Sequence, residues 1–139
     1  MSHKTYEKGI VYYPTVIDGV TDTTTSAAQP VAGAKSIGID FFSANEGSTM
    51  DRVGTLTIEV SLDDGTTWRS YNMLIENSTN TNAQGLIRVS SKQISTAVEN
   101  HLYWMTPETL GGITHVRAKL TRDTEGTGGT FSVKMVITI

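Results

Sequence analysis

The chain has 139 residues and no cysteine, so it has room for one domain whose core must form without disulfides or thiolate metal sites. Its formal net charge is −3 and its 11 Lys and Arg residues are scattered, whereas a nucleic-acid-binding protein carries a basic stripe. No apolar run approaches the roughly 18 residues of a membrane span, and no apolar signal core follows the polar N-terminus. We therefore expect no nucleic-acid partner, no membrane partner, and synthesis in the cytoplasm of the cell that makes the protein.

The first third of the chain is predicted to form an arm or an edge strand. Residues 10–17 are rich in strand-forming side chains but contain Pro14, which cannot donate a hydrogen bond to a β-ladder. Residues 18–35 are rich in Thr, Ala, Gly and Asp, a composition typical of a loop or a poorly ordered arm. We assign residues 1–34 to an extended N-terminal arm or edge strand, which can add to the sheet edge of a neighbouring molecule. The candidate interface residues of this segment are Ile10, Val11, Tyr12 and Tyr13.

Period-two alternation of apolar and polar side chains dominates the chain after Lys35. The alternating segments are residues 37–41, 56–62, 116–120 and 131–139. One face of each such strand is expected to be buried. The returning strand at 68–73 has no clear buried face, and residues 123–129 are expected to form a flexible hairpin loop. About seven or eight short strands with turns between them predict an all-β, antiparallel β-sandwich, Ig-like or jelly-roll-like, over residues 35–139.

Two segments leave the helix content open. The apolar residues of segment 91–105 recur at helical spacing, whereas residues 102–105 also fit a strand. Any helix in this segment is expected near residues 95–100. Further on, a capping threonine and a first-turn proline predict one short helical turn over residues 107–110.

The sharpest local motif is a tight-turn signature at the end of the second alternating strand. It fits the Asp-box pattern Ser-x-Asp-x-Gly-x-Thr-Trp, and its residues are Ser61, Asp63, Gly65, Thr67 and Trp68. The Asp63 carboxylate can accept turn amide protons, Gly65 can take a positive φ, and Trp68 can pack under the turn. We interpret the motif as a structural turn. Calcium binding is the minor alternative, because no further carboxylates stand nearby to supply six or more oxygen ligands.

No arrangement of side chains in the sequence indicates catalysis, a cofactor or a metal. The three histidines, His3, His101 and His115, lack metal-ligand spacing. No Gly-x-Ser-x-Gly elbow is present. The glycines within residues 126–129 do not lead from a strand into a helix, so they do not form a phosphate loop. We therefore expect a protein that is not an enzyme and has no cofactor.

The order of features after Gly54 resembles a group of small tailed-bacteriophage virion proteins. These proteins pair a Ser-x-Asp-Gly-x-Thr-Trp hairpin with a Pro-x-x-Leu-x-Gly-x-x-x-Val-Arg segment, which corresponds here to residues 107–117. With the apolar strand at 130–139, the resemblance covers about two thirds of the chain. It implies a head decoration, cement, capsid-accessory or neck protein that is made in the host cytoplasm and built into the virion. It also implies that the partner is the major capsid protein or another virion protein, with homo-oligomers expected.

Three function classes remain in competition. A virion structural protein is the first, and a carbohydrate-binding β-sandwich module is the second. For the second class, exposed aromatic rings would form a sugar-stacking platform, although such residues are more often core or subunit interface. The candidate rings are Tyr12, Tyr13, Trp68, Tyr71, Tyr103 and Trp104. A small hydrolase is the third class, and the absence of a nucleophile–base constellation argues against it.

Overall fold

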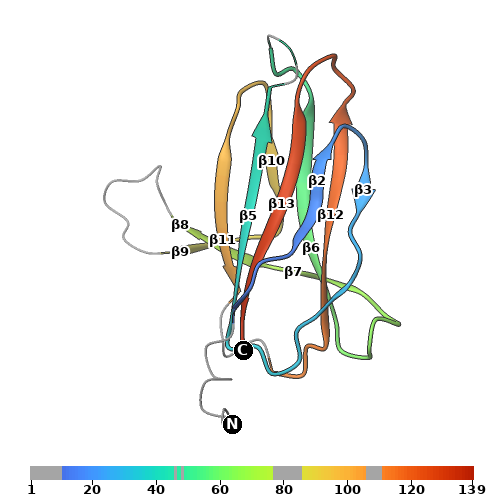
Figure 1. Cartoon of the computed structure of the whole chain (residues 1–139), viewed down its shortest axis with the longest axis vertical. Coiled ribbons are helices and arrows are strands. Elements are labelled where there is room, and N and C mark those ends of the chain that lie inside the picture. Colours follow the sequence, from blue (N-terminus) through green and yellow to red (C-terminus); the bar gives the residue numbers. More distant parts are fainter. Residues whose placement is uncertain (1–10, 46, 48, 77–85, 106–110) are drawn as a thin grey trace.

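Two antiparallel sheets make up the fold. The computed structural model describes residues 11–45, 47, 49–76, 86–105 and 111–139. Within these residues every regular element is a β-strand, and the two sheets pack face to face (Figure 1). The predicted all-β antiparallel sandwich is therefore confirmed. The helical turn predicted at 107–110 lies outside the described residues.

The first sheet, sheet A, has the strand order β1-β13-β5-β11-β8-β9, and β2 also pairs with β13. Its strands are β1 (Val11–Tyr12), β2 (Thr15–Val20), β5 (Ser36–Ala44), β8 (Met73–Glu76), β9 (Leu86–Val89), β11 (Asn100–Met105) and β13 (Thr130–Thr138). Sheet B has the order β10-β6-β12-β3, with β4 also on β12 and β7 also on β6. Its strands are β3 (Thr24–Thr25), β4 (Gln29–Pro30), β6 (Val53–Ser61), β7 (Arg69–Tyr71), β10 (Lys92–Ile94) and β12 (His115–Thr124).

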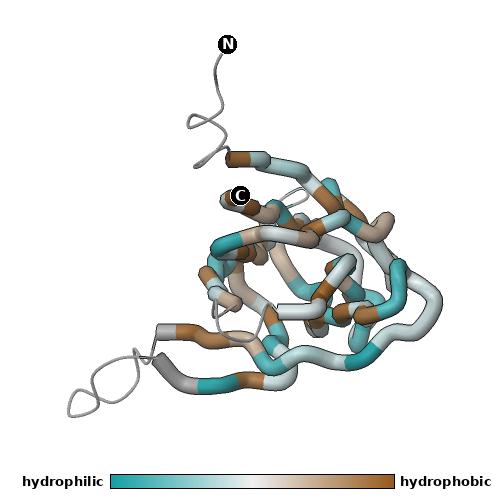
Figure 2. The backbone as a smooth tube through the Cα atoms, turned by 90° about the horizontal axis from the view of Figure 1, so that it is seen from below, coloured by the Kyte–Doolittle hydropathy of each residue, from teal (hydrophilic) through white to brown (hydrophobic). Residues whose placement is uncertain are grey.

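The core lies between the four longest strands, β5 and β13 of sheet A and β6 and β12 of sheet B. Their side chains alternate between the core and the outside, as the sequence pattern predicts, and Figure 2 shows hydrophobic and hydrophilic residues alternating along the chain. The inward residues are Ile37, Ile39, Phe41, Leu56, Ile58, Val60, Val116, Ala118, Leu120, Phe131, Val133, Met135 and Ile137. Burying this apolar surface is the main favourable contribution to folding, at about 25 cal/mol per Å².

At two places the chain passes from one sheet to the other between consecutive short strands. The chain forms β7 on sheet B, passes through Asn72, and forms β8 on sheet A. This change of sheet explains why residues 68–73 show no continuous buried face in the sequence. In the same way β10 lies on sheet B and β11 on sheet A, with a bend at residues 96–97 between them.

The helical alternative for residues 95–100 is wrong, because this segment is the crossing between β10 and β11. Ile94 and Met105 are both buried, but they enter the core from opposite sheets. Val98 and Leu102, which complete the helical spacing, are exposed. The spacing therefore reflects two strands on opposite sides of one core, and the strand alternative for residues 102–105 is confirmed.

Residues 11–34 close one side of the sandwich. β2 pairs with β13 at the edge of sheet A, and β3 and β4 pair with β12 at the edge of sheet B. Between β3 and β4, the Ser26 N–H donates to the Ala118 carbonyl at 2.8 Å, and Ser26 Oγ accepts the Ala118 N–H at 2.9 Å. Ile17 and Val31 are buried. Residues 18–35, expected as a loop or a poorly ordered arm, thus consist of loop residues between short strands, and paired backbone groups and buried side chains hold the segment against its own chain.

The hairpin loop after β12, which we expected to be flexible, is held by Asp51. Asp51 Oδ1 accepts the N–H groups of Thr127 at 2.8 Å and Gly128 at 2.6 Å. Arg52 adds a hydrogen bond from Nη1 to the Gly129 carbonyl at 2.6 Å. These amide N–H groups lower the pKa of Asp51, and the Gly128 amide has the larger effect. Asp51 and Arg52, which directly precede β6, thus hold in place a loop whose own sequence indicates only a turn.

Candidate interaction site

The hairpin turn after β6 is built by the residues of the Asp-box pattern. Ser61, at the end of β6, is buried, and its Oγ donates to Asp63 Oδ1 at 2.8 Å and accepts the Gly65 N–H at 2.8 Å. Asp63 Oδ1 also accepts the Thr67 N–H at 2.8 Å. The Thr67 amide and the Ser61 hydroxyl lower the pKa of Asp63 from 3.8 to about 2. Gly65 has φ +87°, a conformation that costs least for glycine.

A second segment locks the same turn, and no local sequence pattern indicates it. The Thr114 N–H donates to the Ser61 carbonyl at 2.8 Å, and Thr114 Oγ1 accepts the Asp64 N–H at 3.0 Å. Asp64 itself has φ +58°, which Asp tolerates better than most residues. Thr114 directly precedes β12, so the turn is tied to the neighbouring strand of sheet B. Only the folded pairing of β6 with β12 brings these residues together.

Trp68 is engaged by its own chain. The Arg117 guanidinium carbon lies 4.1 Å from the centroid of the Trp68 ring, a cation–π contact. Arg117 Nε also donates to Glu59 Oε1 at 2.8 Å. The indole also lies near Gly65, where an added Cβ would come within 3.7 Å of Trp68 Cζ2. Because the ring is used internally, it supports the fold of its own chain.

The candidate interface residues lie at the edge of sheet A. Val11 pairs with Thr138 and Tyr12 pairs with Ile137, so β1 flanks the end of β13. Tyr12 and Tyr13 are 52% and 71% exposed. Ile10 lies outside the described residues.

An open apolar groove of about 450 Å³ runs beside these tyrosines. Its lining residues are Tyr12, Tyr13, Pro14, Gln29, Pro30, Ile137 and Ile139. The groove joins the edge of sheet A to the edge of sheet B, since Pro30 belongs to β4. Proline and isoleucine side chains from three distant parts of the sequence complete it, which explains why the sequence identified only its tyrosines. We call it the edge groove.

The other aromatic residues do not share one platform. Tyr103 is fully buried in the core, and Tyr71 packs against the core from β7. Trp104 lies on the opposite face of β11 from Tyr103 and is 37% exposed. Trp68 stays under Arg117. A sugar-stacking surface would therefore have to use Tyr12 and Tyr13, or Trp104, separately.

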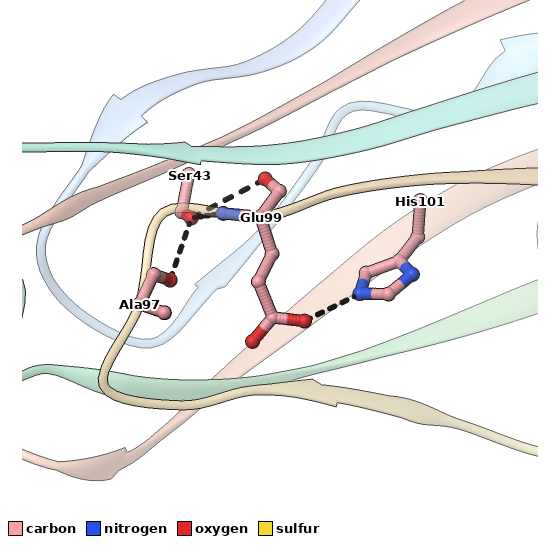
Figure 3. Close-up of polar contacts among 4 residues, drawn as sticks. All are labelled: Ser43, Ala97, Glu99 and His101. Atoms are coloured by element: carbon pink, nitrogen blue, oxygen red, sulfur yellow. Dashed lines mark hydrogen bonds and ion pairs between the residues drawn. The ribbon is translucent and has the colours of Figure 1, made fainter.

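A small polar cluster secures the start of β11 and includes one of the three histidines (Figure 3). Ser43 Oγ accepts the Glu99 N–H at 2.9 Å and lies within hydrogen-bond distance of the Ala97 and Glu99 carbonyls. His101 Nε2 contacts Glu99 Oε2 at 2.8 Å. The serine of the cluster is thus engaged by backbone groups, and the histidine faces the glutamate. The contacts tie β11 to the end of β5.

The Tyr103 hydroxyl lies on the same strand, buried and without a hydrogen-bond partner among the described residues. Burial, and next the charge of Glu99, raise the pKa of Tyr103. Within the described part of the chain, no three His, Asp or Glu side chains gather as a metal site would require. None of the described segments is a helix long and apolar enough to cross a membrane.

Comparison with known proteins yields one structural likeness. No family model matches the chain, and no curated protein matches it. The solved structure of the SPBc2 prophage-derived protein YomS is similar to the chain, with a TM-score of 0.59 and 13% sequence identity over 94% of both chains. At this identity the likeness shows a shared fold, and it extends over nearly the whole of each molecule.

Proposed function

We propose that the protein is a non-enzymatic structural component of a phage virion that decorates or cements the capsid through protein–protein contacts. The observation that carries the proposal is the likeness of the whole sandwich to a prophage-derived protein. The hairpin and Pro-to-Arg motifs, which resemble those of tailed-phage virion proteins, support it independently. On this proposal the chain is made in the host cytoplasm and ends in the virion.

The edge groove is the proposed contact with the major capsid protein or another virion protein. Exposed Tyr12 and Tyr13 beside a mostly apolar groove have the character of interface anchors, since tyrosine is enriched at binding hot spots. The groove is open, so a side chain or a short segment of the capsid surface can enter it. Residues 1–34 include the tyrosines and prolines of this groove, and the proposal that this segment contributes to assembly follows from the same contact.

Mass spectrometry of purified virions tests the structural role. Peptides of this chain should be present in many copies per particle, and their absence from intact virions would refute the proposal. Co-sedimentation of the purified chain with capsids that lack it then tests the groove. Tyr12→Ser with Tyr13→Ser should weaken capsid binding by more than about tenfold. Leu62→Ser, which removes a similarly exposed apolar side chain (57%) from the hairpin on sheet B, is the matched control and should bind normally.

Glycan binding is the second candidate function. The observation that favours it is the pair of exposed tyrosine rings beside the Gln29 amide, which can accept and donate hydrogen bonds to sugar hydroxyls. A glycan array probed with the purified chain separates the two functions. A glycan-binding module should bind a defined sugar and lose that binding with Tyr13→Ser.

A further inference from the structure

The outer face of sheet A carries a row of apolar residues across four adjacent strands. The strand registers place Val136 of β13 opposite Gly38 of β5, Gly38 opposite Trp104 of β11, and Trp104 opposite Leu74 of β8. Val136 and Trp104 are each 37% exposed, and Leu102, which points outward two residues before Trp104, is 50% exposed. Figure 1 shows β13, β5 and β11 side by side. We call this surface the sheet A face.

A ridge and a hollow lie next to each other on this face. Gly38 has no side chain, and an added Cβ would come no closer than 3.8 Å to Val136 Cβ. The space above it is an apolar groove of about 320 Å³, bounded by Val136, Leu102 and Trp104. Trp104 therefore stands as a ridge beside a hollow large enough for an apolar side chain. Buried aromatic anchors of this kind dominate the energetics of protein interfaces.

The next row of the same face carries one cation and one anion. Lys134 of β13 is opposite Asp40 of β5, and Asp40 is opposite Leu102. The Lys134 ammonium lies over the Phe42 ring at 5.6 Å, and Asp40 Oδ1 accepts from Asn100 Nδ2 at 2.6 Å. The two charges balance, so a strongly acidic or strongly basic partner would place a like charge against one of them. A complementary partner presents an anion opposite Lys134 and a cation opposite Asp40.

A second copy of the chain meets each of these requirements. A two-fold axis brings the same patch of two molecules together in reversed order. With that axis along the strands and between β13 and β5, Lys134 of each copy faces Asp40 of the other, and Val136 of each faces the hollow over Gly38 of the other. We infer that the sheet A face is a self-association surface whose occupant is a second copy of this chain. This inference rests on the proposed structural role and deepens it, because it names a second copy of the chain as one of the partners.

The two surfaces are compatible in one molecule. The edge groove lies at the β1 side of β13, whereas the sheet A face lies on the broad surface over β13, β5 and β11. A copy seated on the face leaves the tyrosines of the edge free for the capsid. The arrangement predicts that each contact can be removed without the other.

Sedimentation velocity of the full chain over about 1–100 µM tests the inference, a range in which weak dimers dissociate on dilution. The natural sequence should form dimers with increasing concentration. Val136→Ser, which removes the side chain that faces the hollow, and Gly38→Gln, which fills the hollow from an outward-facing position, should each weaken association by more than about tenfold. Leu62→Ser is the matched control and should associate normally. Circular dichroism melting of every variant separates lost association from lost folding.

A charge exchange makes the test specific for a two-fold contact. Lys134→Asp alone places Asp against Asp across the interface, and Asp40→Lys alone places Lys against Lys, so each variant should be monomeric. Mixing the two variants should restore dimers, because each copy then presents the charge that the other needs. A purely structural effect within one chain would not be repaired by mixing, so failure of the mixture to associate overturns the inference.

Other outcomes identify a different occupant. If the natural chain stays monomeric throughout the range, the inference is wrong. If it is nevertheless found in virions and Trp104→Ser loses capsid binding, the structural role stands and the capsid protein occupies the sheet A face. If the chain dimerises as described but is absent from virions, the self-association surface stands and the proposed function fails.

Discussion

Replacing Gly54 by alanine should destabilise the sandwich, although glycine in a strand is ordinarily a weakness. Gly54 lies in β6 with its α-carbon facing the core, and an added Cβ would meet the Phe131 ring at 2.9 to 3.1 Å. Phe131 is fully buried, and its ring packs against Phe41 at a centroid distance of 6.3 Å. The ring therefore cannot retreat without displacing a second aromatic residue.

Two opposing effects set the magnitude. Alanine restricts the unfolded chain, which stabilises the folded state by about 0.4–1 kcal/mol. Overpacking one carbon against a buried ring costs about 1–3 kcal/mol. The steric effect is the larger, so Gly54→Ala should lower the free energy of unfolding by about 1–2 kcal/mol. With an m-value of about 2 kcal/mol per M, the urea midpoint should fall by about 0.5–1 M.

Urea unfolding followed by circular dichroism measures this change, and a second substitution tests its cause. Phe131→Leu removes the ring atoms that the new Cβ would meet, so Gly54→Ala should cost little in that background. Additive free energies for the two substitutions would show that they do not interact and would refute the steric argument. Gly38→Ala is the matched control, since its nearest contact is 3.8 Å away. At a concentration where the chain is monomeric, Gly38→Ala should be neutral or slightly stabilising.

Three further predictions concern the turn and the N-terminal strands. Gly65→Val should lower the free energy of unfolding by roughly 1–3 kcal/mol, because valine is strained at φ +87°; an unchanged urea midpoint would contradict the turn geometry. The pKa of Asp63 is lowered to about 2 in the folded chain from 3.8, so its stabilising effect is present above pH 3.8 and is lost as the pH falls toward 2. Asp63→Asn should flatten that part of the pH–stability curve, and an identical curve would show that other carboxylates produce it. Ser26→Ala should lower the free energy of unfolding in urea by about 1–3 kcal/mol, because the Ala118 N–H that donates to Ser26 Oγ would be buried without a partner. The Ser26→Thr variant keeps a hydroxyl acceptor and should retain most of the natural stability.

The long strands could be predicted from the sequence because each keeps one face toward the core along its whole length. Residues 37–41 and 131–139 alternate with period two, and the structure buries one face of both. The segments at 68–76 and 92–105 could not be assigned in this way, because each leaves one sheet for the other part-way along. A change of sheet reverses which side of the chain faces the core, and no local pattern records it.

The same distinction applies to the candidate sites. The turn at 61–68 is local, so residue types and spacing were enough to assign a role to each of its residues. The edge groove needs Pro30 and Ile139 beside Tyr13, and the sheet A face needs Gly38 beside Trp104. These neighbours are set by strand pairing across long stretches of chain. The sequence identified tyrosines and tryptophans as candidates, but only the register shows which of them share a surface.

The described edges of the sheets favour contacts through side chains over strand addition between molecules. An exposed edge strand offers free backbone groups for pairing, and short or irregular edges reduce that opportunity. The edge strands β1, β3 and β4 have two residues each, β7 and β10 have three, and β9 has four. The six-residue β2 is interrupted by register shifts along β13 and has Gly19 at φ +59°. Because residues 11–34 already complete both sheets of their own chain, a partner has more to gain from the broad sheet A face and the edge groove, where exposed tryptophan, leucine and tyrosine side chains lie beside open hollows.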